Sequence, residues 1–416
     1  MSDGFDRKES IFDRSINKRN TLIKNRNILQ TTYIPDQLPH REMEIRNIVD
    51  ILTPSLNKDK PSNILITGKT GTGKTAVLSY IGKELLKADP EKENCSLVYV
   101  NCEIVDNQYG ILYNISNQII KEQAQKIPFT GWSIDRVYDT LMNYIESENK
   151  VFIIILDEID RILQKSGEDM FYYLTTMNEM LKQSKVSIIG VTNSTKFTEF
   201  ISPKIRSRLG EEKIIFSPYN PTQLQDILKK RAEIAFDEGI VDEGVIPYCA
   251  AISAQDSGDA RKALDLLRIS ADIAERNGDL KITDAHVNSA RSKIELDAVV
   301  EVIKTLTVQS KIVLMSIIKN HEDNRTSIIT GDVYTTYKEI SSILNYTILK
   351  EKRVADLISE LDMLGIIHAR VKSFGRNGRT REIELNINRD IIDFVSKDDL
   401  FEPLGKYKPP KQTTLI

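Results

Sequence analysis

The sequence predicts an α/β domain built on a parallel sheet, then an all-helical domain, then a C-terminal winged-helix domain. Between residues 63 and 218, short apolar runs alternate with longer amphipathic stretches, which is the pattern of repeated strand–helix units. After Pro218 only helical spacing remains, up to about residue 295. From Leu296, three helical stretches precede two alternating stretches joined by Asn377-Gly378, a strong hairpin signal.

The length of the chain also favours several domains, because 416 residues exceed what one hydrophobic core usually organises. The first 30 residues are rich in Lys, Arg, Asn and Asp and show little apolar periodicity, so we interpret them as a mobile or loosely docked arm. The predicted parts are the arm at 1–30, the α/β domain at 31–218, a helical lid at 219–295, the winged-helix domain at 296–398 and a tail at 399–416.

Composition indicates a soluble globular protein, with 40% hydrophobic and 28% charged residues. The polar N-terminus does not resemble a signal peptide, and the longest apolar run, at 151–156, is too short to span a bilayer. We therefore expect no membrane partner. Cys95, Cys102 and Cys249 have no metal-ligand or redox spacing, and their odd number argues against a disulfide framework, so we interpret them as buried side chains in a reducing cytoplasm. Because the formal net charge is only -3, any nucleic-acid surface must be local.

Five apolar runs are the candidate strands of the sheet. Each is nearly continuous in Val, Ile and Leu, as expected for strands that are covered on both faces. The helical stretches between them imply parallel crossover connections. The runs are NILITG, SLVYVNC, VFIIILDE, VSIIGVTNS and KIIFSP.

A phosphate-binding loop follows the first of these strands. GKTGTGKT fits the pattern G-x-x-x-x-G-K-[ST] and lies between a strand and a helix, a context that a chance glycine-rich turn does not require. Its backbone N–H groups and the helix N-terminus suit phosphate oxygens, and Lys74 would reach the β- and γ-phosphates. The expected nucleotide-binding residues here are Gly68, Lys69, Thr70, Gly71, Thr72, Gly73, Lys74, Thr75, Ala76 and Val77.

Carboxylates at the end of the third strand suggest hydrolysis. Asp157 would bind Mg²⁺ together with the hydroxyl of Thr75, and Glu158 could orient or deprotonate the attacking water. An acidic pair can also simply cap a helix. The pair indicates hydrolysis here because it follows a phosphate loop and ends a buried strand. Asn193, at the end of the fourth strand, could hold the same water, although Asn at strand ends commonly makes turns.

These motifs, taken with SRLG at Arg208 and SGDARKAL at Arg261, resemble the AAA+ ATPase series. With YIPDQLPHREMEI, FSPYNPTQLQDIL and the C-terminal winged helix, the chain resembles archaeal replication initiators. The type is that of cell division control protein 6 and origin recognition complex subunit 1. The resemblance extends from about Ile11 to about Val395.

The resemblance implies further nucleotide contacts. Pro39, His40 and Arg41 would lie by the adenine, and Arg261 would reach the γ-phosphate from the lid. Tyr219 and Arg231 match nucleotide-contacting positions of the lid. The alternative to a nucleotide contact is that Tyr219 is a core residue after a turn and that Arg231 is a solvated residue on a helix.

The resemblance also implies an arginine finger, which acts on the nucleotide of a neighbouring subunit. Arg208 matches that position, and Arg206 is a near competitor that sequence does not exclude. The implied catalytic set is therefore Lys74, Glu158, Asn193 and Arg208.

A local basic surface in the winged-helix domain predicts contact with double-stranded DNA. No acidic residue lies between Asp362 and Glu382, and cations also begin the candidate recognition helix. Arginines at a hairpin tip can enter a minor groove while flanking cations neutralise phosphates. The alternative is a solvated hairpin whose charges only protect an edge strand. The candidates are Lys350, Lys352, Arg353, Arg370, Lys372, Arg376, Arg379 and Arg381.

A second DNA contact is possible in residues 125–145, where AAA+ initiators carry a helical insertion. Its candidates are Lys126, Pro128, Phe129 and Trp132, which could widen a minor groove. Ordinary helix packing with Trp132 as a core anchor is the alternative.

The function predicted from this resemblance is that of an ATP-dependent replication initiator. It would bind origin DNA through the winged helix, hydrolyse ATP slowly to ADP with Mg²⁺, and recruit the replicative helicase beside other initiator protomers at the nucleoid. A DNA-binding transcriptional regulator built from the same modules is the alternative. A clamp-loader subunit is disfavoured, because those subunits end in a helical collar. The terminal KQTTLI resembles a truncated clamp-docking peptide, so we expect at most weak contact with the sliding clamp.

Overall fold

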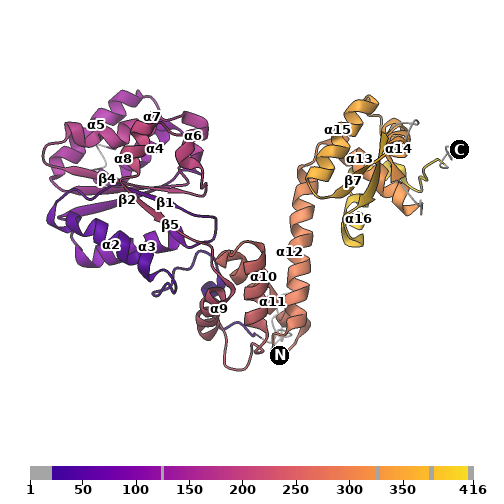
Figure 1. The fold of residues 1–416 in the computed structure, drawn as a ribbon, viewed down its shortest axis with the longest axis horizontal. Coiled ribbons are helices and arrows are strands. Elements are labelled where there is room, and N and C mark those ends of the chain that lie inside the picture. The colour runs from indigo at the N-terminus through magenta and orange to yellow at the C-terminus, as the bar shows by residue number, and fades with distance from the viewer. Residues whose placement is uncertain (1–20, 123–125, 324–327, 374–378, 411–416) are drawn as a thin grey trace, which may run out of the picture. The chain divides into compact units, whose positions relative to one another are not determined.

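The computed structural model describes residues 21–122, 126–323, 328–373 and 379–410. The chain divides into two compact units, Met1–Asn288 and Ser289–Ile416, each considered by itself below (Figure 1). Within the described ranges, no helix is long and apolar enough to cross a membrane.

A five-stranded parallel sheet is the centre of the first unit, and it confirms the predicted fold class. Its spatial order is β2-β3-β4-β1-β5, with every neighbouring pair parallel. Because the strands are parallel, their carboxyl ends meet at one edge of the sheet. The strands are β1 (Ile64–Thr67), β2 (Cys95–Asn101), β3 (Val151–Asp157), β4 (Lys185–Thr192) and β5 (Glu212–Ile215).

Helices cover both faces of this sheet, which explains why the central strand β3 is buried throughout (Figure 1). The edge strand β5 differs from the expectation of strands covered on both faces, because all of its residues except Ile214 are exposed. On β3, Ile153 and Ile155 pack on the face covered by α2 and α3, whereas Ile154 and Leu156 pack on the face covered by α4 to α8. The described helices of this domain are α2 (Glu42–Leu52), α3 (Lys74–Ala88), α4 (Gln108–Ile119), α5 (Ile134–Glu148), α6 (Asp160–Ser166), α7 (Asp169–Met180) and α8 (Pro203–Leu209), with 3-10 helices η2 (Thr53–Asn57) and η4 (Phe197–Glu199).

The lid completes the first unit with α9 (Pro221–Ala235), α10 (Val245–Asp256), α11 (Ala260–Asn277) and the start of α12 (Asp284–Thr305). A segment from the predicted arm packs against it: η1 (Arg26–Leu29) lies on α9 and α11, and Ile23 forms an isolated antiparallel bridge with Phe236. The apolar side chains of this segment, though few, are buried. They are Leu22, Ile23, Ile28 and Leu29.

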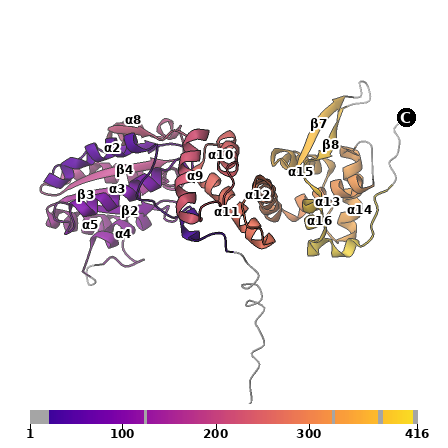
Figure 2. The same ribbon diagram turned by 90° about the horizontal axis from the view of Figure 1, so that it is seen from below.

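The second unit contains the predicted winged helix. The helices α13, α14 and α15 share one core with a small antiparallel sheet of order β6-β8-β7, and Figure 2 shows its β7–β8 hairpin. Phe401 and Leu404, from the range expected to be the tail, are also buried in this core. The elements are α13 (Val308–Glu322), β6 (Ile328–Ile329), α14 (Thr330–Ile343), α15 (Glu351–Met363), β7 (Ile367–Ser373), β8 (Arg379–Leu385), α16 (Arg389–Ser396) and η6 (Asp399–Leu404).

Candidate functional site

A cavity of about 770 Å³ lies at the carboxyl edge of the large sheet, between the α/β domain and the lid. Its wall combines three parts of the first unit: the phosphate loop with the strand ends, the lid helices α9 and α11, and the segment Thr31–Pro39. From the predicted set it is lined by Thr70, Gly71, Gly73, Lys74, Thr75, Ala76, Asp157, Glu158, Asn193, Tyr219, Arg231 and Arg261. Gly68, Lys69, Thr72 and Val77 are not among its lining residues, and Val77 is buried in the core instead.

The phosphate loop takes a conformation that requires glycine. Gly71 and Gly73 have φ angles of +73° and +92°, in the left-handed region that other residues rarely adopt. A Cβ on Gly73 would also lie 2.8 Å from the hydroxyl of Tyr219. Gly71 and Gly73 line the cavity, and the loop passes directly into α3, which begins at Lys74.

Lys74 connects the loop to the end of β4. Its ammonium donates hydrogen bonds to the carbonyl oxygens of Gly68 and Lys69, at 2.6 and 2.8 Å, and to Oδ1 of Asn193 at 2.8 Å. Burial lowers the pKa of Lys74 to about 8, against the opposing effect of the Asp157 carboxylate. The side chain is still a cation at neutral pH and lines the cavity.

Asp157 has the surroundings of a metal-binding carboxylate. Its Oδ2 accepts hydrogen bonds from the hydroxyls of Thr75, at 2.9 Å, and Tyr99, at 2.7 Å. In the described part of the chain, no three His, Cys, Asp or Glu side chains converge into a metal cage. The oxygens of Asp157 and Thr75 suit Mg²⁺, and a Mg²⁺ ion held by so few protein ligands takes the others from phosphate and water. The residues therefore fit a cation that arrives with a nucleotide.

Glu158 is the next residue, and its backbone is unusual. Its φ angle of +60° is uncommon outside glycine and asparagine, and such backbone conformations cluster at functional sites. Burial raises the pKa of Glu158 above its ordinary value, and the nearby Glu103 and Asp157 carboxylates act in the same direction. The amide of Asn193 donates to Oε1 of Glu158 at 3.4 Å. Asn193 therefore contacts both Lys74 and Glu158.

The three lid residues that were predicted to bind nucleotide differ in their contacts. Tyr219 is buried, and the guanidinium of Arg41 lies 4.0 Å from the centre of its ring. Arg261, at the start of α11, is exposed and lines the cavity. The guanidinium of Arg231 is buried and donates to the backbone oxygens of Ile28 and Tyr33, at 2.9 and 3.0 Å. Arg231 thus holds the cavity wall as well as lining it.

Of the residues predicted to lie by the adenine, Pro39 lines the cavity. His40 instead lies 2.8 Å from Asp226 on α9, and Arg41 donates to the backbone oxygens of Thr72 and Ser217. Arg41 therefore connects the backbone of the phosphate loop to the segment that follows β5. No role was predicted for several other lining residues, among them Thr31, Thr32, Ile227, Lys230, Ile234 and Leu264. Ile227 and Leu264 lie within the family-like segments, whereas the other four belong to no motif, because the walls are assembled from distant segments.

The two candidate finger residues lie on α8, away from this cavity. Arg208 pairs with Glu179 at 2.6 Å, and its Nη1 is buried with no hydrogen-bond partner among the described residues. Arg206 is exposed. The side chain of an arginine finger must be able to release its contacts within its own subunit. The single ion pair of Arg208 with Glu179 contributes little energy, so the side chain can break it at small cost.

In the second unit, the predicted DNA-binding cations fall into two groups. Lys350, Lys352, Arg353, Arg370 and Lys372 are exposed. Arg353 pairs with Glu360 at 3.4 Å, and Lys372 pairs with Glu382 at 3.0 Å. These exposed side chains lie at the start of α15 and along β7.

Arg381 differs from these residues, because its guanidinium contacts α15, the candidate recognition helix. Its Nη1 donates to Oγ of Ser359 at 2.5 Å and to the backbone oxygen of Ala355 at 3.3 Å. It thereby connects β8 to α15. Arg379 is the first residue of β8 and pairs in the ladder with Ser373, and Arg376 lies outside the described residues.

The insertion before β3 combines a packed tryptophan with an exposed loop, and DNA contact by that loop stays a prediction. Trp132 packs against the core of the α/β domain, with the guanidinium of Arg136 4.0 Å from its ring centre. Phe129 is 75% exposed and touches Tyr113 edge-on. Lys126 and Pro128 are exposed as well. The tryptophan is thus a packing residue, whereas the loop before it presents an apolar ring to solvent.

Comparison with known proteins agrees with this organisation. Three family models match: the ATPase family associated with various cellular activities over residues 64–218, the Cdc6 AAA+ ATPase-type lid domain over 225–292, and the CDC6 C-terminal winged helix domain over 301–395. Membership of the AAA+ ATPases implies nucleotide binding.

Relatives that match almost the whole chain show which AAA+ family it belongs to. The ORC1-type DNA replication protein of Thermococcus onnurineus is 46% identical over 393 residues, 94% of each chain. That of Pyrococcus furiosus is 47% identical over 393 residues, which are 94% of this chain and 93% of the relative. The solved structure of the Aeropyrum pernix ORC1 protein in complex with DNA is 41% identical, with a TM-score of 0.73, and the match covers 92% of this chain and 98% of that one. The chain therefore belongs to the family of ORC1-type DNA replication proteins, as the sequence predicted.

Proposed function

We propose that this replication initiator binds ATP with Mg²⁺ in the cavity of its first unit and hydrolyses it slowly to ADP. It would bind double-stranded origin DNA through its winged helix, so that the bound nucleotide controls how the protein acts at the origin. The observation that carries the nucleotide part is the meeting of Lys74, Asp157, Glu158 and Asn193 at one cavity edge. That set combines a phosphate-binding cation with carboxylates for a metal and for a water.

Each of these residues has a separate task. Lys74 binds the β- and γ-phosphates, and the N–H groups at the start of α3 bind their oxygens. Thr75 and Asp157 would hold the Mg²⁺, which neutralises the charge that develops on the phosphates. Glu158 orients the attacking water and accepts its proton, a task that its raised pKa favours. Asn193 keeps Glu158 and Lys74 in position, and Arg261 contacts the γ-phosphate from the lid.

The DNA part rests on the exposed cations of α15 and β7 and on the relative solved with DNA. Lys350, Lys352 and Arg353 would contact the major groove or its phosphates, and the wing would contact the adjoining backbone. The hydrogen bonds of Arg381 to α15 would keep these two elements in a fixed relation. Other protomers and the replicative helicase are the proposed protein partners, in the cytoplasm at the nucleoid. The relatives found are replication proteins and do not favour a transcriptional regulator.

Two substitutions test the nucleotide site. Lys74→Ala should abolish tight ATP binding, whereas Glu158→Gln should retain binding and stop phosphate release. Lys83→Ala is the matched control, because Lys83 lies on the helix that follows the loop but its side chain is exposed and does not line the cavity. Equilibrium binding of a fluorescent ATP analogue and single-turnover hydrolysis are the measurements. Unchanged ATP affinity in Lys74→Ala would refute the site.

Footprinting across the chromosome tests the proposed role. An initiator should protect sites next to a replication origin, and protection there should depend on the winged-helix cations. Protection confined to promoters would instead support the transcriptional alternative.

A further inference from the structure

One wall of the cavity is made by a segment that comes from far away in the sequence. Residues 21–39, here called the N-terminal strap, first pack on the lid and then run along the cavity, which Thr31–Pro39 lines. Tyr33, Ile34, Pro35 and Leu38 give this wall an apolar character. The phosphate-binding groups lie on the other part of the lining, at Lys74 and Asp157. The strap wall therefore suits the base and sugar of a nucleotide rather than its phosphates.

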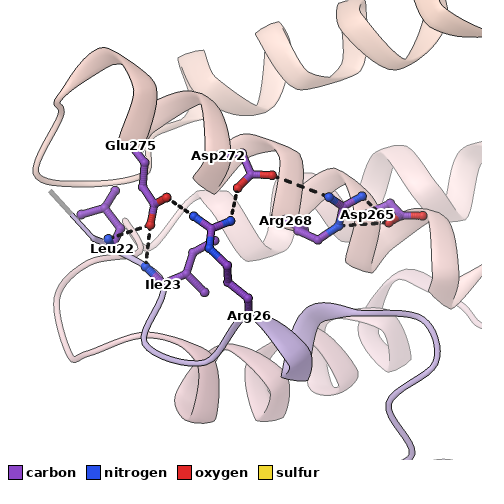
Figure 3. Close-up of polar contacts among 7 residues, drawn as sticks. All are labelled: Leu22, Ile23, Arg26, Asp265, Arg268, Asp272 and Glu275. Carbon is purple, nitrogen blue, oxygen red and sulfur yellow. Dashed lines mark hydrogen bonds and ion pairs between the residues drawn. The ribbon is translucent and has the colours of Figure 1, made fainter. Parts of the chain in front are cut away.

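The strap is anchored on α11 by one buried carboxylate (Figure 3). Glu275 is 4% exposed, and its Oε1 accepts hydrogen bonds from the backbone N–H groups of Leu22, at 2.8 Å, and Ile23, at 3.0 Å. Its Oε2 pairs with the guanidinium of Arg26. A buried carboxylate needs such donors, and a charged hydrogen bond in this setting is stronger than a neutral one.

The guanidinium of Arg26 also contacts a second carboxylate of α11, which belongs to a series of ion pairs along that helix. Its other amino group lies 2.5 Å from Asp272, which faces Arg268 at 3.6 Å, and Arg268 in turn pairs with Asp265 at 2.9 Å (Figure 3). Asp272 thus contacts a cation of the strap on one side and a cation of its own helix on the other. Arg26 is fixed between two acidic residues that are one turn of helix apart.

A second anchor lies between the first one and the cavity. Arg231 on α9 is buried and donates to the backbone oxygens of Ile28 and Tyr33. Its guanidinium also lies 4.6 Å from the centre of the Tyr33 ring. The strap is therefore held at Leu22–Arg26 and again at Ile28–Tyr33, and the second hold passes directly into the cavity wall.

The helix α11 joins the anchor to the site. Its first two turns present Arg261 and Leu264 to the cavity, and its last turns carry Asp272 and Glu275. Given the proposed nucleotide site, we infer that Glu275 and Arg26 are positioning residues for the nucleoside part of the ligand, which they act on through the strap without touching it. Releasing this anchor frees the wall and speeds nucleotide dissociation, while the phosphate loop remains intact.

The test compares two anchor variants with two matched controls. Glu275→Gln puts an amide where only acceptors fit, and Arg26→Ala removes the cation from a half-exposed position where folding should be insensitive. The controls are Asp237→Asn and Lys24→Ala, since Lys24 of the same strap pairs with Asp237 of the same lid at 3.0 Å, but both side chains are about 70% exposed. Removing an exposed pair of this kind costs little.

The full-length protein is loaded with fluorescent ADP, and its release is followed after adding excess unlabelled ADP. We expect both anchor variants to release ADP about tenfold faster than the parent, and both controls to match the parent. Competition by inorganic tripolyphosphate, which lacks base and sugar, should be the same in all five proteins. Hydrogen exchange should rise in residues 22–38 of the anchor variants and stay low in α3.

Unchanged ADP release in Arg26→Ala and Glu275→Gln would overturn the inference, as would an equal loss of ADP and tripolyphosphate binding. If Glu275→Gln does not fold, Arg26→Ala decides alone. A failure of the nucleotide site is recognised separately. It would appear as unchanged nucleotide affinity in Lys74→Ala, whatever the anchor variants do.

Discussion

The hydroxyl of Tyr99 on β2 donates a hydrogen bond of 2.7 Å to Oδ2 of Asp157 on the neighbouring strand. The same oxygen accepts from Thr75, so two hydroxyls fix the orientation of the proposed metal-binding carboxylate. Burial and this hydrogen bond raise the pKa of Tyr99, and its proton therefore stays on the phenol at neutral pH. No sequence motif distinguishes Tyr99, because a tyrosine in an apolar run gives no chemical signal.

The first prediction concerns this tyrosine. Tyr99→Phe should leave ATP binding without Mg²⁺ unchanged and raise the Mg²⁺ concentration needed for half-maximal hydrolysis by about tenfold, since losing such a supporting hydrogen bond commonly costs 10- to 100-fold in metal affinity. A Mg²⁺ titration of phosphate release measures it. Tyr109→Phe is the control, because the hydroxyl of Tyr109 bonds to the backbone of Pro128 instead. Identical Mg²⁺ curves for Tyr99→Phe and the parent would contradict the prediction.

The arginine finger can be identified by mixing variants. Arg208→Ala should retain ATP binding but reduce hydrolysis by about a thousandfold on DNA that supports assembly, because a finger acts on the neighbour's transition state. Adding Lys74→Ala protomers, which cannot hydrolyse ATP themselves but keep Arg208, should restore part of the activity. Arg206→Ala is measured in parallel. A loss confined to Arg206→Ala would assign the finger to that residue and leave Arg208 as the structural partner of Glu179.

The winged-helix surface makes a prediction about salt. Arg370→Ala should weaken binding to duplex DNA and reduce the slope of log K against log salt by about one, as expected for one lost phosphate contact. Lys304→Ala serves as the control, since Lys304 is exposed on α12, pairs with Glu301 and lies outside the predicted surface. Fluorescence anisotropy at several salt concentrations measures both slopes. An unchanged slope for Arg370→Ala would remove β7 from the DNA-binding surface.

A buried carboxylate in the turn after α3 makes the first unit sensitive to acid. Burial alone would raise the pKa of Asp89, but the backbone N–H groups of Cys95, Asn94 and Glu93, at 2.9 to 3.1 Å, outweigh it and hold the pKa below its ordinary value. A carboxyl with a depressed folded-state pKa stabilises the protein above its unfolded pKa. That contribution is lost as pH falls through the folded value.

Asp89→Asn should therefore lower the free energy of unfolding of the first unit by about 1–3 kcal/mol at pH 7, because one or two buried N–H groups lose their acceptor. The difference from the parent should shrink as pH falls below about 4. Calorimetric unfolding across pH measures it. Glu91→Gln, at an exposed position of the same turn, should match the parent at every pH. A difference for Asp89→Asn that does not depend on pH would show that packing, not charge, is involved.

The sequence by itself determined the fold class, the family and the chemical core of the candidate site. The apolar run at 151–156 predicts a strand covered on both faces, and the spacing of glycines around Lys74 predicts a strand–loop–helix phosphate site. Such signals are local, because periodicity and turn chemistry act over a few residues. The fold and the family comparisons confirm the predicted α/β, lid and winged-helix architecture, and they also confirm the replication-initiator family.

Only the tertiary structure decided which side chains share the cavity and which support it. Arg231 lies beside the site and also bonds to the strap, Arg381 bonds to α15, and Glu275 collects donors from more than 250 residues away in the chain. No local pattern distinguishes these side chains from solvated ones. The role of a charged residue is determined by its burial and by the partners that satisfy it, and both arise only when distant segments pack together.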